Sequence, residues 1–479
     1  MTIATLRKLA AIINAALDTL ERELAAESLE FPTLDAPYDS TAPPEGVLER
    51  ESAAHAIDLI VAASSQLCAS VRKPTLTMVE LAWQHMLPAA LRFLTAIDVI
   101  ELLADVGPQG MHVQDIAQKA DVDSEKLAHA LRFCATYHVF TEVAPDVFAN
   151  NRLSSVLNKG KSYDVLQTMS GSKYEDTNGH AAWLELNSST FLPAAASLTQ
   201  HNTDPRTKFS KEPTCTALAR GAGFEGKSLF AWLEEPQNGP ALQAFGVSMR
   251  ATEAWETQDA ILEAFDWSSL PEGSVVVDIG GGIGNIVFPL YERFPHLRFE
   301  VQDRGKTCMH GQAVWNKKYP DAIASGRVTF REHNFFEAQP RTDAAVFLIR
   351  HCVHNWADAY AVKILQHLRN AAQPSTRLVV AEHILPYACA ASVLDARSDI
   401  PGASLEPVPE PLLANLGRVC GNACSLDQLM QSILNAKERT LEEHARILEG
   451  SAWKIERVNR VRGDRLYGHI VAAPQSRVG

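Results

Sequence analysis

The chain has 479 residues and a formal net charge of −13 at pH 7, with 46% hydrophobic and 21% charged residues. The chain is too long to fold around a single hydrophobic core, so we expect two or three structural units. The acidic balance opposes nonspecific binding to nucleic acid or anionic lipid, and no uninterrupted apolar run is long enough to cross a bilayer. The N-terminus leads into an amphipathic pattern unlike a signal peptide, so we expect a cytoplasmic protein without a nucleic-acid or membrane partner.

The eight cysteines are scattered, as is typical of free thiols in a reducing compartment. Cys420 and Cys424 are the closest pair. No second Cys or His pair accompanies them at a zinc-site spacing, so the sequence predicts no metal.

The first 72 residues predict a helical extension. Apolar residues recur every three or four positions from Ile3 to about Ala26, and a second helical run covers 53–71. Prolines interrupt the segment between them. Two helices cannot form a core alone, so we expect them to pack on a neighbouring domain or on a second subunit.

Residues 73–162 predict a winged-helix-like domain. Helices are expected over 91–103, 113–120 and 123–135, and the short strands 139–143 and 147–149 resemble a wing. A helix-turn-helix with a wing invites a DNA-binding interpretation. However, acidic and basic residues in the segment are nearly balanced, and acidic side chains occupy the first turn of the second helix. We therefore favour a protein–protein role.

Residues 163–255 predict helical connections. Phe245 and Met249 lie in this segment, where they either pack between helices or line a pocket. From residue 256 to 479 strands and helices alternate, with two closing strands at 453–461 and 466–473. This alternation predicts an α/β fold, a mostly parallel sheet with helices on both faces. Ligands in such folds bind at the carboxyl ends of the strands.

A glycine cluster follows the first strand of this domain. The strand 275–279 contains Asp278, the turn 280–284 contains four glycines, and Asp303 ends the next strand, where it is placed to bond ribose hydroxyls. A dinucleotide fingerprint fits imperfectly because its third required glycine is Asn285. The pattern Asp-x-Gly-x-Gly-x-Gly fits better and favours S-adenosylmethionine over NAD, with a ligand-free tight turn as the third interpretation.

The candidate catalytic segment follows a strand predicted at 344–349. His354 suits proton removal near neutral pH, but it needs a partner that stabilises its protonated form. Glu382 lies at another strand end, and Glu438 lies further along the chain. A single histidine at a strand end is more often a packed or exposed residue, so its neighbours decide the interpretation.

Three motifs in order resemble the plant caffeic-acid-type O-methyltransferases and their relatives in fungal secondary metabolism. They are Val277-Asp-Ile-Gly-Gly-Gly-Ile-Gly, His354-Asn-Trp-Ala-Asp358 and Lys437-Glu-Arg-Thr440. The resemblance covers roughly residue 75 to the C-terminus. It implies a Rossmann-like class I methyltransferase sheet, a winged-helix-like dimerisation domain, and a homodimer that methylates a hydroxyl of a small phenolic or polyketide-like acceptor.

The resemblance also implies residue roles. His354 would be the general base, and Glu382 and Glu438 would orient it. S-adenosylmethionine would contact Asp278, Gly280, Gly282, Asp303, Asn334, Phe335 and Arg350. The acceptor pocket would include Phe245, Met249, Asn355 and Asn435.

Two residues depart from the family pattern, since Asn355 and Asn334 stand where many members have aspartate. The proline-rich segment 390–430 also lengthens the gap between the glutamates, and we expect a lid or a substrate-specific wall there. Two alternatives remain. One is a non-catalytic S-adenosylmethionine-binding regulator acting through the winged helix, and the other keeps the cofactor but changes the chemistry.

Overall fold

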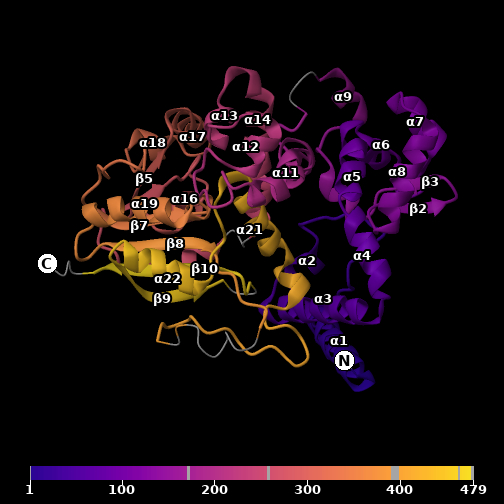
Figure 1. Cartoon of the computed structure of the whole chain (residues 1–479), viewed down its shortest axis with the longest axis horizontal. Coiled ribbons are helices and arrows are strands. Elements are labelled where there is room, and N and C mark those ends of the chain that lie inside the picture. The colour runs from indigo at the N-terminus through magenta and orange to yellow at the C-terminus, as the bar shows by residue number, and fades with distance from the viewer. Residues whose placement is uncertain are drawn as a thin grey trace. The chain divides into compact units, whose positions relative to one another are not determined.

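The computed structural model describes residues 2–169, 173–255, 259–389, 397, 399–461 and 464–475. The chain divides into two compact units, which are coloured by residue number in Figure 1. The N-terminal unit comprises Met1–His201 and Ala217–Trp255, and the C-terminal unit comprises Asn202–Thr216 and Glu256–Gly479. The predicted domain boundaries, including a catalytic domain that starts at residue 256, stay predictions.

The N-terminal extension forms a helical pair, α1 (Ile3–Ala26) and α3 (Glu51–Val71), joined through α2 (Pro43–Leu48). A capping box at Thr2 begins α1, and Pro43 occupies the first turn of α2, where its missing N–H costs nothing. Small residues of α3 meet the apolar stripe of α1. The buried side chains are Leu9, Ala16, Leu20, Leu24, Ala53, Ala56, Ala62 and Ala63. The apolar stripe that predicted α1 therefore packs on the second predicted helix.

Among the described residues, α3 is the single helix long and apolar enough to cross a membrane, with a mean hydropathy of 1.3. The alanine face of the same helix lies against α1. Length and composition alone are weak evidence for a membrane span.

A winged-helix-like body follows α4 (Pro74–Trp83). The helices α5 (Met86–Ala96), α6 (Val99–Val106), α7 (Val113–Ala120) and α8 (Ser124–Thr136) surround one hydrophobic core. The strands β1 (Met111–His112), β2 (Thr141–Ala144) and β3 (Val147–Ala149) pair in the order β1-β3-β2. The wing predicted at 139–149 thus gains a third strand from the residues just before α7.

The single helix predicted over 91–103 is wrong, because α5 ends at Ala96 and α6 begins at Val99. Asp98 between them has a left-handed backbone with φ of 56°. Its carboxylate lies 3.1 Å from the Lys159 ammonium, and that ammonium is buried and also contacts Glu101 at 2.8 Å. This long-range ion pair fixes the break, which the local apolar pattern did not reveal.

The rest of the N-terminal unit is helical, as predicted for 163–255. The elements are α9 (Tyr163–Thr168), α10 (His180–Glu185), a π turn (Leu186–Thr190), α11 (Leu192–Thr203), α12 (Ala217–Ala222), α13 (Leu229–Leu233), α14 (Gly239–Ser248) and a 3₁₀ turn (Met249–Trp255), with shorter 3₁₀ turns at Ser154–Leu157 and Pro236–Asn238. The last residues of α11 belong to the C-terminal unit.

The C-terminal unit is built on a seven-stranded sheet of order β6-β5-β4-β7-β8-β10-β9. The first five strands run parallel, and β10 pairs antiparallel with both β8 and β9. The strands are β4 (Val275–Ile279), β5 (Arg298–Asp303), β6 (Val328–Glu332), β7 (Ala344–Arg350), β8 (Arg377–His383), β9 (Trp453–Arg460) and β10 (Tyr467–Pro474). The predicted parallel sheet and its two antiparallel closing strands are therefore present.

Helices cover both faces of the sheet (Figure 1). Val275, Val277 and Ile279 face α19 (Asp358–Ala371) and α22 (Leu441–Gly450), whereas Val276 faces the opposite layer. That second layer contains α15 (Ala260–Glu263), α16 (Val287–Arg293), α17 (Gly305–Lys318) and α18 (Pro320–Ala324). Burial on both faces explains why β4 opens with three consecutive valines, Val275 to Val277.

The predicted insertion at 390–430 falls partly outside the described residues, which omit 390–396 and 398. Its later part forms a 3₁₀ turn (Gly417–Cys420) that leads into α21 (Gly421–Leu434). The role of a lid or substrate wall stays a prediction.

Candidate active site

The turn after β4 is shaped by its glycines, three of which have a backbone conformation that other residues rarely adopt. Gly280, Gly282 and Gly284 have φ of 65°, 60° and 79°, in the left-handed region. Gly281 has a different constraint, because a Cβ there would stand 2.2 Å from Asp278 Oδ2. A Cβ on Gly282 would meet nothing within 4 Å. The turn thus packs tightly against the strand and leaves open space on its outer side.

Asp278 lies beneath this turn with almost no exposed surface. Neither of its carboxylate oxygens has a hydrogen-bond partner among the described residues. Burial raises its pKa to about 7, although nearby Arg350 opposes the shift and Asp303 adds to it. A buried, unpartnered carboxylate beside an open turn fits a ligand with positive charge.

Asp303 closes the turn from the neighbouring strand. Its Oδ2 accepts a hydrogen bond from the Gly282 N–H at 2.9 Å, and its Oδ1 accepts one from the Arg304 N–H at 2.7 Å. Carboxylate oxygens have further acceptor capacity, so both can still bond ribose hydroxyls. Asp303, the residue predicted to bond the ribose, is therefore held at the rim of the glycine turn.

Asn334 and Phe335 follow β6. Asn334 accepts from the Phe336 N–H at 3.1 Å and donates to Glu337 at 3.2 Å, which folds the segment into a local turn. The Phe335 ring lies 3.6 Å from the position of a Cβ on Gly280. Phe335 thus lies at the glycine turn, whereas the Asn334 amide makes its hydrogen bonds within its own loop. Their contacts with adenine stay a prediction.

His354 sits in a 3₁₀ turn (Val353–Asn355) after β7 and is almost fully buried. Its Nδ1 lies 2.5 Å from Oε1 of Glu438, which is 84 residues later in the chain. A carboxylate on Nδ1 favours the tautomer with the proton on that nitrogen. The lone pair is then on Nε2, which is the arrangement that a general base requires.

The two partners shift each other's pKa in opposite directions. Burial by itself lowers the pKa of His354, but the Glu438 carboxylate more than offsets this, and the pKa is raised above its usual value. Burial by itself raises the pKa of Glu438, but His354 more than offsets this, and the pKa is lowered below its usual value. The pair therefore stabilises a protonated imidazole beside an ionised carboxylate.

Glu382, at the end of β8, contacts the backbone near His354. Its Oε1 accepts from the N–H groups of Cys352 at 3.2 Å and of His354 at 3.0 Å. Burial raises the pKa of Glu382, partly offset by His354. The two glutamates predicted to orient His354 thus make different contacts, one with the ring and one with the loop that carries it.

Arg439 is a residue whose contribution the sequence did not reveal, although it lies inside the third motif. Its fully buried guanidinium donates to the carbonyls of Val353 at 3.0 Å and Trp356 at 2.7 Å, and to Asp358 Oδ1 at 3.0 and 3.1 Å. Asp358 also lies 3.2 Å from the Lys437 ammonium. These bonds connect the second motif to the third, and the only signal in the sequence was that Arg439 lies inside the third motif.

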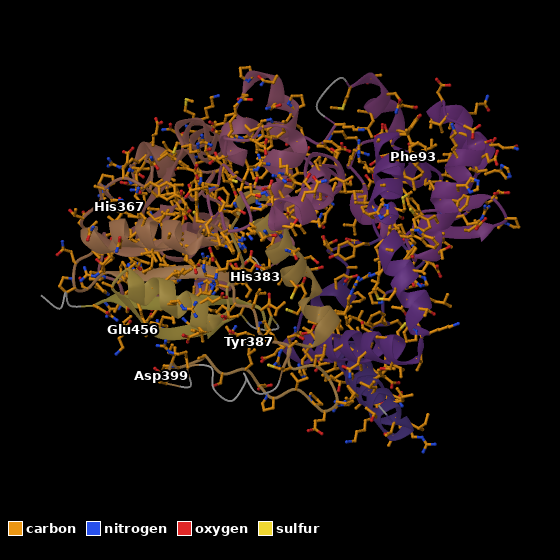
Figure 2. All side chains as sticks on the ribbon, in the orientation of Figure 1. Phe93, His367, His383, Tyr387, Asp399 and Glu456 are labelled. Carbon is orange, nitrogen blue, oxygen red and sulfur yellow. The ribbon has the colours of Figure 1, made fainter. Side chains whose placement is uncertain are left out.

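Other buried histidines surround the pair. The His351 ring is 5.5 Å from the His354 ring and 5.6 Å from the His383 ring, and Figure 2 labels His383, the last residue of β8. Burial lowers the pKa of both His351 and His383. Near neutral pH these rings are uncharged. His383 Nδ1 also faces Glu438, at 3.8 Å from Oε2, so what distinguishes His354 is the shorter contact of 2.5 Å with Oε1.

The four predicted acceptor-pocket residues are separated between the units. Asn355 donates to the His351 carbonyl at 3.2 Å, and Asn435 donates to the carbonyls of Glu212 at 2.9 Å and Cys215 at 2.5 Å. Phe245 and Met249 belong to the N-terminal unit, where Phe245 packs edge-on against Phe230. Asn355, Asn435 and Phe245 thus each make a specific side-chain contact, and the Met249 carbonyl accepts from the Thr252 hydroxyl at 2.7 Å. The roles of all four residues toward an acceptor stay predictions.

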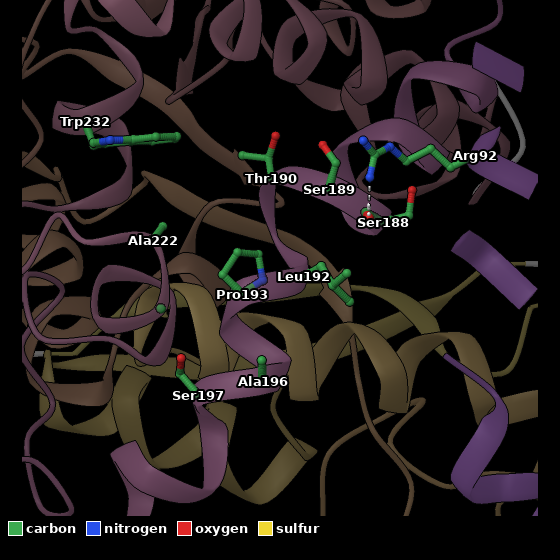
Figure 3. Close-up of a pocket in the computed structure, with 11 residues that line it drawn as sticks. Arg92, Ser188, Ser189, Thr190, Leu192, Pro193, Ala196, Ser197, Ala222 and Trp232 are labelled. Carbon is green, nitrogen blue, oxygen red and sulfur yellow. Dashed lines mark hydrogen bonds between the residues drawn. The ribbon is translucent and has the colours of Figure 1, made fainter. Parts of the chain in front are cut away.

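The N-terminal unit has a cavity of about 700 Å³, shown in Figure 3. Arg92 stands on one side, where it donates to the Ser188 carbonyl at 3.3 Å, and Trp232 stands on the other. The remaining lining residues are Ser189, Thr190, Leu192, Pro193, Ala196, Ser197, Gly221 and Ala222. Neither Phe245 nor Met249 lines it, and no sequence pattern indicated it.

Within the described parts of the chain, no three His, Cys, Asp or Glu side chains are grouped to hold a metal ion. The sulfurs of Cys420 and Cys424 lie 3.3 Å apart as free thiols.

The chain matches two family models, the O-methyltransferase domain over residues 227–400 and the O-methyltransferase dimerisation domain over residues 79–160. An O-methyltransferase of Armillaria gallica is 35% identical over 98% of this chain and 99% of its own. The 4-O-methyltransferase 1 of Phanerochaete chrysosporium is 37% identical over 95% of this chain and 96% of its own. A solved structure described as a pericyclic reaction enzyme shares the fold, with a TM-score of 0.67 and 17% identity over 96% of this chain and 99% of that one.

This chain belongs to the O-methyltransferase family. It is an S-adenosylmethionine-dependent enzyme of the plant-type branch found in fungal secondary metabolism, and the predicted class I methyltransferase fold is confirmed. Its dimerisation domain supports a homodimer.

Proposed function

We propose that this enzyme methylates a hydroxyl oxygen of a small aromatic acceptor, phenolic or polyketide-like, with His354 as the general base. One observation carries the proposal: the buried imidazole of His354 lies 2.5 Å from the Glu438 carboxylate, in the loop after β7. The name of the P. chrysosporium relative, 4-O-methyltransferase 1, supports a hydroxyl acceptor.

The residues around the glycine turn suit the cofactor. Asp278 has no partner for its carboxylate, Gly282 leaves space, and Asp303 presents a carboxylate at the rim. When bound, S-adenosylmethionine supplies a methyl group on a positively charged sulfur. Asp278 and Asp303 would place negative charge toward that ligand, Arg350 would balance it, and Phe335 would offer an apolar surface to the adenine.

His354 would take the acceptor's hydroxyl proton on Nε2 while Glu438 stabilises the imidazolium that forms. Glu382 would hold the backbone of residues 352–354, and Arg439 would hold the same loop from the other side. Burial would exclude water from this proton transfer. The acceptor oxygen loses its proton to His354 as it reacts. Most of the rate enhancement would therefore come from positioning the acceptor and from this proton transfer.

The test measures transfer of a labelled methyl group from S-adenosylmethionine to a panel of phenols. We expect His354→Ala to lower turnover by about 10²–10⁴-fold, the usual contribution of a general base. Cofactor affinity should change little, because His354 is not part of the glycine turn. His129→Ala, on an exposed face of α8, is the matched control and should behave as wild type.

Near-normal turnover by His354→Ala with cofactor still bound would refute the base assignment. The same fold also occurs in a pericyclic reaction enzyme, so a second chemistry must be distinguished. Labelled methyl absent from every product would count against methyl transfer. Binding of genomic fragments in a mobility-shift assay, decreasing with added salt, would support the regulator hypothesis instead.

A further inference from the structure

Asp427 is an acidic residue beside the His354–Glu438 pair that has no part in the mechanism proposed for that pair. It lies in α21, and its Oδ1 accepts a hydrogen bond from the backbone N–H of Glu438 at 2.9 Å. The side-chain Oε1 of Glu438 in turn lies 2.5 Å from His354 Nδ1. Glu438 therefore bonds Asp427 through its backbone and the imidazole through its side chain.

The backbone at Glu438 is attached on two sides. After it in the chain, Arg439 forms a parallel bridge with Ile384, and the Arg439 carbonyl accepts from the Leu385 N–H at 2.9 Å. Asp427 supplies the other attachment, from the preceding helix. Because Glu438 is almost fully buried, its N–H needs a partner within the protein. Loss of the Asp427 acceptor would free this N–H while the bridge at Arg439 keeps the segment in place.

Neighbouring charges on balance disfavour an ionised Asp427. Burial raises its pKa, and the carboxylates of Glu438 and Glu443 add to the shift, whereas the hydrogen bond from Glu438 and the Lys437 ammonium oppose it. Two like charges close by make a negative charge costly at this position. The contribution of Asp427 is therefore an acceptor oxygen held at a fixed place.

We propose that Asp427 is a positioning residue that sets the Glu438 carboxylate against the His354 imidazole, an inference that rests on the proposed function. The attraction between the two groups weakens as they move apart. Losing the Asp427 acceptor would therefore lower the pKa of His354 toward its ordinary value and loosen the orientation of the ring. A misplacement of about 1 Å can cost about 10²-fold in rate.

The other imidazoles near Glu438 do not obscure this effect. His383 and His444 both lie close enough to lower the pKa of Glu438, as His354 does. Burial lowers the pKa of His383, and it lowers that of His444 to about 4. Both rings are uncharged near neutral pH, so a shift in the acid limb of the activity profile reports on His354.

The test compares Asp427→Ala with Asp427→Asn in methyl-transfer assays across pH. We expect Asp427→Ala to lower kcat by about 10–10²-fold, to leave cofactor affinity nearly unchanged, and to move the acid limb of kcat/KM to lower pH. Asp427→Asn keeps an acceptor oxygen and loses the charge, so it should retain the wild-type kcat and acid limb. Gln428→Ala is the matched control, because Gln428 follows in α21 and bonds Gln431 of the same helix.

A double-mutant cycle shows whether Asp427 acts through Glu438. Residues that act as one unit have strongly non-additive effects. In the Glu438→Gln background, Asp427→Ala should therefore have almost no further effect on kcat. Far-UV circular dichroism and cofactor titration check that each variant is folded. Asp427→Glu, which moves the acceptor by one methylene group and keeps the charge, replaces Asp427→Ala if the latter does not fold, with the same expected direction.

The pKa of the His354 imidazole can also be measured without turnover, by NMR titration of protein carrying ¹³C at the histidine Cε1. His354→Ala identifies the signal by its absence. The pKa should be lower in Asp427→Ala than in the wild type. This measurement separates the two hypotheses, because turnover retained by His354→Ala would refute the base assignment whether or not Asp427 controls the ring.

Three results would overturn the role of Asp427. Wild-type kcat and an unmoved His354 pKa in Asp427→Ala would show that Glu438 keeps its place without this bond. Equal impairment of Asp427→Asn and Asp427→Ala would assign the effect to charge. An equal effect of Asp427→Ala with and without Glu438→Gln would mean that Asp427 acts independently of Glu438.

Discussion

Two turns at the same edge of the sheet are built in opposite ways. The turn after β4 takes its shape from its own residues, with left-handed glycines and a Gly281 that has no room for a Cβ. The loop after β7 takes its shape from distant segments, because Glu382, Glu438 and Arg439 all bond to it from elsewhere in the chain. A turn shaped by its own residues suits a ligand that does not change, such as a cofactor. A loop held by three residues from elsewhere in the chain fixes the position of the His354 ring.

The sharpest test of this contrast removes one distant bond from the second loop. Glu438→Gln keeps the size of the side chain but loses the charge that stabilises a protonated His354. We expect turnover to fall by about 10²–10⁴-fold while cofactor affinity is nearly unchanged. Steady-state rates and calorimetric titration of the cofactor measure both quantities. Glu442→Gln, an exposed glutamate of α22, is the control.

The same variant has a signature in the pH profile. His354 must be unprotonated to act as a base, and its pKa is raised, so activity should rise with pH through a value above 6.5. Loss of the Glu438 charge lowers that pKa, and the acid limb of kcat/KM should move to lower pH. An acid limb that stays in place would show that another group controls it.

The contrast also explains what the sequence could predict. The strand β4, its glycine turn and Asp303 were predicted from residues within thirty positions of each other. His354, Glu382 and Glu438 were candidates from the sequence itself, but only the resemblance to a known family assigned their roles, because nothing local distinguishes a catalytic histidine. The separate contacts of the two glutamates, and the whole role of Arg439, depend on bonds between residues more than 25 positions apart.

The second prediction concerns Arg439, which connects the two motifs. Arg439→Met removes a buried charge and four hydrogen bonds, and leaves the carbonyls of Val353 and Trp356 without that donor. We expect the free energy of unfolding to fall by about 3 kcal/mol, near the lower limit for a broken buried pair because Asp358 is partly exposed and can be hydrated. Chemical denaturation monitored by tryptophan fluorescence measures this. Arg446→Met is the control on α22, since no ion pair or hydrogen bond involving its side chain is seen among the described residues.

A stable Arg439→Met protein with normal turnover would show that the loop after β7 keeps its shape without this residue. The contrast between the two turns would then rest on the glutamates alone.

The third prediction addresses the locally built turn. Gly281→Ala places a Cβ 2.2 Å from Asp278 Oδ2 and 2.9 Å from Val301 Cγ1, so the turn must shift outward. Overpacking of this kind costs about 1–3 kcal/mol, and we expect cofactor affinity to fall by roughly 5–150-fold. Gly246→Ala in α14, where a Cβ meets nothing within 4 Å, should bind cofactor as wild type does. Equal cofactor affinities for the two variants would mean that the turn has room for a Cβ at position 281, contrary to its geometry.

The smallest expected effect is a pH dependence of cofactor binding that belongs to the first turn alone. Burial raises the pKa of Asp278 to about 7, with Arg350 opposing the shift and Asp303 adding to it, so the carboxylate is mostly neutral at pH 6 and mostly ionised at pH 8. A cationic ligand favours the ionised form, and affinity for S-adenosylmethionine should therefore increase up to about tenfold across this range. Asp278→Asn should abolish the increase, and S-adenosylhomocysteine, whose sulfur is uncharged, should show a shallower one. An identical slope in Asp278→Asn would assign the titration to a different group, and affinity that decreases with pH would contradict the role of Asp278 as a counter-charge.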